Sequence, residues 1–261
     1  MICPQCSQGS FLPGEPTGTF SDEFQGAYFA PGPGEGPSKR AVLYLTDAFG
    51  LDLKNSKIMA DEFAKRLECD VWIPDYFAGK PLLPVDCMVL PDRAGVKYSP
   101  WTWIKFFFAI VLPSIPSIIR NRPANTDPRV ISLIGLLKEK KQYEKIGAVG
   151  YCFGGATSVR LGSTDLVDSI IIAHPGTFTL DQAKAIKVPV SWVCAEDDMF
   201  FPDSLRDKCE AAFAARDVRD DFVDHEFIVY KGLWFFNETQ VVAESSILFA
   251  HRNCPRICDP T

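Results

Sequence analysis

The sequence predicts an α/β fold with a mostly parallel central sheet and helices on both faces. Short, continuous apolar runs alternate along the chain with segments of helical spacing, a pattern typical of right-handed βαβ units. One such run leads into the hexad Gly150-Tyr151-Cys152-Phe153-Gly154-Gly155, and a helical segment follows it. This hexad has the pattern of a nucleophile elbow, which is a strained turn from a strand into a helix.

The predicted elements follow one another from about residue 40 onward. The apolar runs predict strands over 41–45, 69–74, 146–149, 169–173, 188–193 and 225–230. Apolar residues at helical spacing predict helices over 55–67, 128–141, 156–161 and 205–215. Residues 1–40 are rich in Gly and Pro, so we expect an N-terminal arm and a surface turn there.

Residues 101–119 form an apolar segment that approaches the length of a membrane-spanning helix. Lys105, Pro113 and Pro116 interrupt it. We therefore expect a buried or cap-like segment rather than a transmembrane helix.

Composition limits the partners and the compartment. A chain of 261 residues with 47% hydrophobic residues can bury one large core, and the net charge of −6 gives no electrostatic footprint for nucleic acid or an anionic membrane. Small-molecule or protein partners are expected. The N-terminus shows no basic segment followed by an apolar stretch, as a secretory signal would have. The nine cysteines do not have the spacing of a disulfide framework. Both observations predict a cytoplasmic location with reduced thiols. The sequence does not fix the oligomeric state.

The hexad carries the main chemical prediction. Gly150 and Gly154 are small enough for the close backbone approach that an elbow requires. Cys152 would stand at a helix N-terminus, where backbone N–H groups favour an anion and lower the pKa of a thiol. We therefore expect a reactive thiol. The alternative is a buried structural cysteine in a glycine-rich turn.

Functional groups gather at the carboxyl ends of the strands in an open parallel sheet. The polar residues that follow the first five core strands are Asp47, Asp75, Cys152, His174 and the pair Asp197-Asp198. Asp198 is the better candidate for the acid that orients a catalytic imidazole. The alternative is a solvated acidic turn that caps a helix starting near Asp203.

The general base is the least defined part of the predicted site, because the chain has only three histidines. His225 begins the last predicted strand. His174 follows a strand but precedes the acid. His251 lies downstream of Asp198, in the chain order nucleophile, acid, histidine that this architecture uses, and it is our candidate.

Several ordered motifs together resemble the dienelactone hydrolase family. They are the hexad, Leu45-Thr46-Asp47-Ala48-Phe49-Gly50, Pro74-Asp75-Tyr76-Phe77-Ala78-Gly79-Lys80-Pro81 and residues 195–202. Cys3-Pro4-Gln5-Cys6 and Thr17-Gly18-Thr19 are similar to a pattern in the family's fungal members. The resemblance covers residues 1–232.

The resemblance implies an α/β-hydrolase fold over residues 41–232 and the hydrolysis of a small lactone or ester through a thioacyl intermediate. It makes Cys152 the nucleophile and Asp198 the acid, and it assigns the oxyanion hole to the backbone N–H groups of Ala48 and Phe153. Asp47 stands where bacterial members have a glutamate that influences the protonation of the cysteine. The resemblance implies no cofactor and no metal.

The resemblance ends after Gly232, where the family carries its catalytic histidine within a few residues. Here 233–248 is foreign sequence, and Phe249-Ala250-His251-Arg252 resumes a family pattern. The family's C-terminal helix is also missing before Thr261. We treat 233–261 as a divergent tail and hypothesise a splice or gene-model variant; an uninterrupted exon from Gly232 to Phe249 would refute this.

Three functions stay open at this point. The first is a thiol hydrolase whose turnover is impaired by the loss of the family histidine. The second is a catalytically silent member that binds a ligand or partner in the same pocket. The third is metal or redox chemistry at Cys3 and Cys6, with Cys254 and Cys258 as the other close pair.

Overall fold

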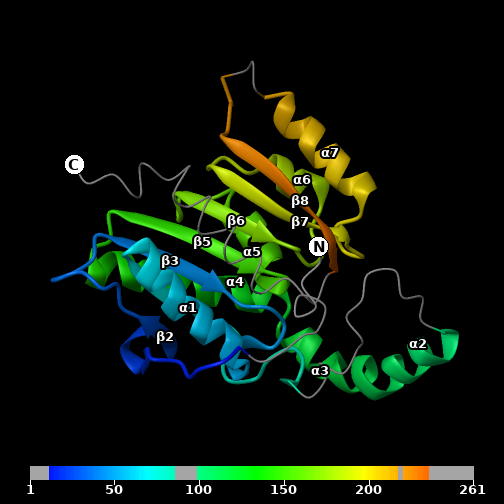
Figure 1. Ribbon diagram of the computed structural model, residues 1–261, viewed down its shortest axis with the longest axis horizontal. Coiled ribbons are helices and arrows are strands. Elements are labelled where there is room, and N and C mark those ends of the chain that lie inside the picture. Colours follow the sequence, from blue (N-terminus) through cyan, green and yellow to red (C-terminus); the bar gives the residue numbers. More distant parts are fainter. Residues whose placement is uncertain (1–11, 86–98, 217–219, 235–261) are drawn as a thin grey trace.

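The computed structural model describes residues 12–85, 99–216 and 220–234. An eight-stranded sheet in the order β1-β2-β4-β3-β5-β6-β7-β8 forms its centre (Figure 1). The strands are β1 (Thr19–Ser21), β2 (Ala27–Ala30), β3 (Arg40–Leu45), β4 (Asp70–Ile73), β5 (Lys145–Tyr151), β6 (Ser169–Ala173), β7 (Val190–Asp197) and β8 (His225–Trp234). Strands β3 to β8 are parallel, which confirms the predicted α/β class.

Helices cover both faces of the sheet. The helices of the described residues are α1 (Lys54–Leu67), α2 (Pro100–Phe106), α3 (Leu112–Arg120), α4 (Pro123–Leu136), α5 (Phe153–Leu161), α6 (Leu180–Lys184) and α7 (Asp203–Ala214), and all of them except α2 and α3 pack on the sheet. Two 3₁₀ turns (Asp22–Phe24 and Gly50–Asp52) and two π-helical turns (Phe107–Val111 and Leu137–Lys141) complete the described elements.

The core has two parts because apolar side chains leave the parallel strands on both faces. On one face, α1 packs Met59, Phe63 and Leu67 against the sheet. On the other, α4, α5, α6 and α7 contribute to a larger cluster that contains Trp72 and Trp192, both fully buried.

The segment that we expected as an N-terminal arm adds two strands to the sheet. Strand β2 pairs antiparallel with β4, and β1 pairs antiparallel with β2. The hydroxyl of Tyr28 on β2 donates to Asp61 Oδ1 of α1 at 2.7 Å and accepts from the backbone N–H of Gly18 at 2.7 Å. Residues 18–30 therefore belong to the folded body.

Parallel strands bring the predicted polar residues to one edge of the sheet. Asp47, Asp75, Cys152, His174 and Asp198 follow the ends of β3, β4, β5, β6 and β7 respectively. His225 begins β8, in register with Val190 at the start of β7. Its imidazole therefore lies at the opposite edge from Cys152.

The apolar segment at 101–119 is helical but not buried. Most of the described side chains of α2, the π-helical turn and α3 face solvent, with Trp101 63%, Phe108 62% and Ile119 60% exposed. Of the two expected alternatives, a buried segment was wrong, because these helices extend beyond the sheet rather than pack on it (Figure 1), and a cap-like segment stays a prediction. Within the described residues, no helix has the length and apolarity needed to cross a bilayer.

Candidate active site

Cys152 occupies a strained turn between β5 and α5. Its backbone has φ 50° and ψ −110°, a combination that residues other than glycine rarely adopt. The turn is held by Cys152 N–H donating to the carbonyl of Ala173 at 3.1 Å and by Gly176 N–H donating to the carbonyl of Cys152 at 2.7 Å. This geometry is that of the nucleophile elbow.

The glycines on either side of Cys152 are required by close backbone contacts. A Cβ on Gly150 would lie 2.2 Å from the carbonyl oxygen of Gly154. A Cβ on Gly154 would lie 2.1 Å from the carbonyl oxygen of Leu45, at the end of β3. The elbow and the loop after β3 can therefore approach only because both positions lack a side chain.

The close approach brings two backbone donors to the sulfur. The N–H groups of Phe153 and Ala48 both hydrogen-bond to Cys152 Sγ and favour its thiolate. Gly154 N–H donates to the carbonyl of Thr46 at 3.0 Å, and Leu83 N–H donates to the carbonyl of Ala48 at 3.1 Å. These bonds fix the loop after β3 against the elbow, so the two donors converge from different segments.

Tyr76 supports both of those segments, a role that no pattern in the sequence predicted. Its buried hydroxyl donates to the carbonyl of Thr46 and lies 3.0 Å from Thr46 Oγ1. Its ring stacks on Phe153, with centroids 5.8 Å apart. Tyr76 lies three residues after β4, so its place near the carboxyl ends of the strands could be predicted from the sequence. Its contact with Thr46 could be found only from the fold.

Asp198 lies buried at the end of β7, with 5% of its surface exposed. Its Oδ1 accepts from the N–H groups of Phe200 at 2.8 Å and Phe201 at 3.0 Å, and its charge raises the pKa of Cys152. The alternative of a solvated capping turn was wrong, because the carboxylate is buried and α7 has no side-chain N-cap.

The thiol of Cys152 has a high pKa rather than the low one that we expected. Cys152 is partly exposed, but neighbouring atoms enclose the sulfur, and this burial raises its pKa to about 12. The charges of Asp47 and Asp198 raise it further and outweigh the two backbone donors. At neutral pH the resting group is therefore a thiol, which needs a base before it can attack.

Asp47 couples to the cysteine by charge. Burial raises the pKa of its carboxyl group to about 6, and the N–H of Phe49, which donates to Oδ1 at 2.8 Å, opposes this rise. Above pH 6 the carboxylate carries a negative charge that disfavours a second negative charge on Cys152. Asp47 therefore acts against thiolate formation in the resting site.

The described histidines make poor bases for Cys152. His225 lies at the opposite edge of the sheet, where Nδ1 is 2.9 Å from the carbonyl oxygen of Val223. His174 lies at the correct edge, but burial lowers its pKa to about 4, so protonation there is costly. His251 lies outside the described residues, as do Cys3, Cys6, Cys254 and Cys258.

We expect Asp47→Asn to speed the alkylation of Cys152 by iodoacetamide about tenfold at pH 8, because it removes a nearby negative charge. The amide keeps an acceptor for Phe49 N–H. Below pH 6 the two rates should converge, because Asp47 is then protonated in the wild type. Peptide mass spectrometry over a pH series measures both rates.

The matched control is Asp75→Asn, at the end of the neighbouring strand β4. Its Oδ1 also accepts a backbone hydrogen bond, from Gly79 N–H at 3.1 Å. We expect this variant to alkylate at the wild-type rate. A rate for Asp47→Asn that equals the wild-type rate at every pH would contradict the coupling.

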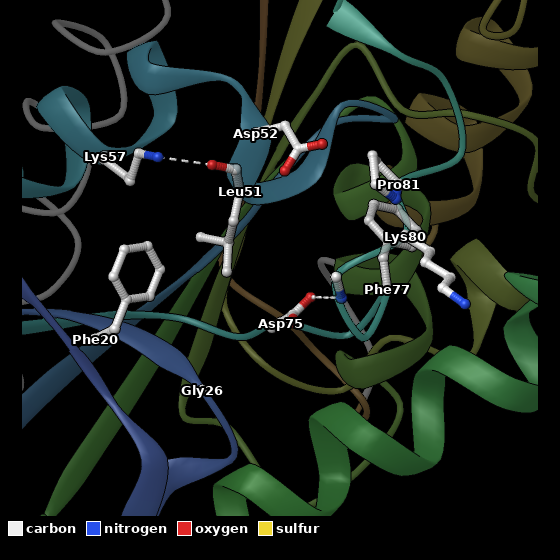
Figure 2. Close-up of a pocket in the computed structure, with 10 residues that line it drawn as sticks. Phe20, Gly26, Leu51, Asp52, Lys57, Asp75, Phe77, Lys80 and Pro81 are labelled. Carbon is white, nitrogen blue, oxygen red and sulfur yellow. Dashed lines mark hydrogen bonds between the residues drawn. The ribbon is translucent and has the colours of Figure 1, made fainter.

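A pocket of about 520 Å³ lies beside this site rather than at it (Figure 2). Phe20 and Phe77 contribute rings to its lining, and none of the predicted catalytic residues in the described part of the chain takes part. The charged groups of the lining are those of Asp52, Lys57, Asp75 and Lys80. The ring of Phe77 also packs on Phe153, with centroids 5.1 Å apart. The pocket and the elbow therefore share one wall.

Comparisons with known proteins place this geometry in a family. A profile of the dienelactone hydrolase family matches residues 113–242, which include Cys152 and Asp198. Hydrolase pyvD of Aspergillus violaceofuscus is 31% identical over 213 residues, covering 82% of this chain and 78% of the relative. The chain belongs to the dienelactone hydrolase family. Hydrolase tropI of Talaromyces stipitatus is also 31% identical, over 201 residues that cover 77% of this chain and 73% of the relative.

Solved structures agree on the fold of this dienelactone hydrolase family member. A dienelactone hydrolase-like promiscuous phosphotriesterase from metagenomic libraries has a TM-score of 0.56 at 19% identity, covering 94% of this chain and 99% of that one. An α/β serine hydrolase from Xanthomonas campestris has a TM-score of 0.54 at 9% identity, covering 97% and 99%. The fold is that of the α/β hydrolases, and the family identifies the chain as a hydrolase of lactone or ester substrates.

Proposed function

We propose that this chain hydrolyses small lactones or carboxylic esters through a thioacyl intermediate on Cys152. The observation that carries the proposal is the convergence of two backbone donors, from Ala48 and Phe153, on a sulfur in a strained elbow. Donors placed in this way would stabilise the oxyanion of a tetrahedral intermediate. Asp198 is the acid, since it is buried and close enough for its charge to affect the sulfur.

Proton transfer limits the proposed reaction. The sulfur must lose a proton that it holds with a pKa of about 12, and the described histidines do not supply a base. We propose that the acyl group reaches Cys152 slowly and leaves it more slowly still, because attack by water also needs a base. If the chain turns over faster than these slow steps allow, we propose His251 as the general base.

The test is chemical rescue by imidazole, with p-nitrophenyl acetate as the ester. If the base is missing, steady-state release of p-nitrophenol by the wild type should rise with imidazole concentration, and His251→Ala should change nothing. If His251 acts as the base, His251→Ala should lower turnover and imidazole should restore it. If the wild type turned over the ester no faster than Cys152→Ala under every condition, the chain would be a catalytically silent binding protein.

Tyr76→Phe should slow acylation of Cys152 by p-nitrophenyl acetate about tenfold to a hundredfold, because the loop that carries Ala48 loses the hydroxyl that holds Thr46. Alkylation by iodoacetamide forms no oxyanion, so its rate should fall by a much smaller factor, which reflects only the weaker hydrogen bond from Ala48 N–H to the thiolate. Stopped-flow release of p-nitrophenol and peptide mass spectrometry measure the two rates. An equal loss in both would show damage to the nucleophile itself rather than to the oxyanion hole.

A further inference from the structure

A helical arm, residues 100–122, concentrates the exposed apolar side chains of the molecule. Fourteen large hydrophobic residues are exposed in the described part of the chain, and eight of them lie in this arm. They are Trp101, Ile104, Phe107, Phe108, Leu112, Ile115, Ile118 and Ile119. Exposed apolar side chains gathered in one segment in this way mark an interaction site.

Helix α3 has its apolar side chains on the solvent side and a polar one on the buried side, the reverse of an ordinary surface helix. Ser114 is buried with 7% of its surface exposed, whereas Leu112, Ile115 and Ile118 on the solvent side are 40% to 45% exposed. A surface helix normally turns its apolar stripe to the core and its polar residues to water. The opposite arrangement indicates that the outer face of α3 meets an apolar medium.

The arm also differs from the rest of the chain in charge. Residues 100–122 contain Lys105, Arg120 and Arg122 and no Asp or Glu, whereas the whole chain carries a net charge of −6. All three basic residues are exposed. The net charge of the whole chain argues against attraction to an anionic surface, but the arm has the opposite sign locally.

The base of the arm is fixed to the reactive edge of the sheet. Asn121, fully buried at the end of α3, donates from Nδ2 to the carbonyl of Lys80 at 2.8 Å, in the loop that follows β4. In Figure 1 the arm extends from the side toward which the arrows of the parallel strands point. A surface that receives the arm therefore also faces the edge that carries Cys152.

We propose that the arm binds the surface of a lipid bilayer that contains anionic phospholipids. The apolar side chains enter the boundary between headgroups and acyl chains, and the three cations lie among the phosphates. Lipid fits better than a second copy of this chain, because pairing two arms would bring like charges together. Binding to lipid does not depend on the proposed hydrolysis.

The test is co-sedimentation of the full chain with phosphatidylcholine vesicles, prepared with and without phosphatidylserine. We expect strong binding only when phosphatidylserine is present. The combined variant Lys105→Gln, Arg120→Gln and Arg122→Gln should bind about a hundredfold more weakly, because each cation near the surface contributes about a fivefold gain. The control variant Lys65→Gln, Lys184→Gln and Lys208→Gln changes the net charge equally, at exposed sites outside the arm, and should bind as the wild type does.

A second pair of variants tests the apolar contribution. Phe108→Ser in the arm should weaken vesicle binding about tenfold, whereas Phe222→Ser, at a residue 55% exposed before β8, should not. Equal binding to both vesicle types, or equal losses in the paired variants, would overturn the proposal. So would light scattering that shows a dimer dissociated by Phe108→Ser, together with no vesicle binding.

Discussion

Cys152→Ala should abolish the acylation of this chain and lower ester hydrolysis at least about a thousandfold. The residual rate would come from the backbone donors and from binding, which remain in the variant. Cys152 is the residue at the strained elbow, and its sulfur is the atom that the two backbone donors meet, so we expect no other side chain to take its role. The pre-steady-state release of p-nitrophenol measures the effect directly.

The control for this prediction is Cys209→Ala, which removes another free thiol, buried on α7. We expect this variant to keep the wild-type rate of acylation. If Cys152→Ala and the wild type released p-nitrophenol equally, the chain would bind esters without reacting through this residue, and the silent alternative would hold.

Gly154→Ala should destabilise the fold by at least about 3 kcal/mol. The added Cβ would lie 2.1 Å from the carbonyl oxygen of Leu45 and 2.7 Å from that of Thr46, and both are backbone atoms that cannot rotate away. The loop after β3 would have to move, which would also remove Ala48 from the sulfur. Urea unfolding followed by tryptophan fluorescence measures the stability, because Trp72 and Trp192 are buried.

Gly135→Ala is the matched control, since it adds the same methyl group to a glycine in α4 that has nothing within 4 Å of the new Cβ. We expect it to raise stability by about 0.5–1 kcal/mol, because alanine is the better helix former. Equal stability of the two variants would contradict the role of Gly154 as the contact between the elbow and the loop.

The core strands, and the candidate site residues that follow them along the chain, could be predicted because both depend on local sequence patterns. Apolar runs marked β3 to β8, and the residues that follow five of these strands do meet at one edge. Strands β1 and β2 were missed because they have three and four residues and lie in a segment, residues 1–40, that is rich in Gly and Pro. Their pairing with β4 is a long-range contact that no local pattern contains.

The chemistry of the site depended more on contacts that are distant in sequence. The helix N-terminus predicted a low thiol pKa for Cys152, but burial of the sulfur raises it, and so do the charges of Asp47 and Asp198, which follow β3 and β7. Tyr76 shows the same limit, since its hydroxyl finds Thr46 thirty residues earlier. The apolar composition of the arm predicted a buried or cap-like segment, and only the fold shows that its apolar side chains point outward.

Mass spectrometry after a brief exposure to p-nitrophenyl acetate decides whether Cys152 is the nucleophile. We expect one acetyl group on Cys152, formed faster as the pH rises from 7 toward the thiol pKa of about 12 and lost slowly after the ester is removed. An unmodified Cys152 in a chain that still hydrolyses the ester, or acetylation spread equally over other residues, would contradict it.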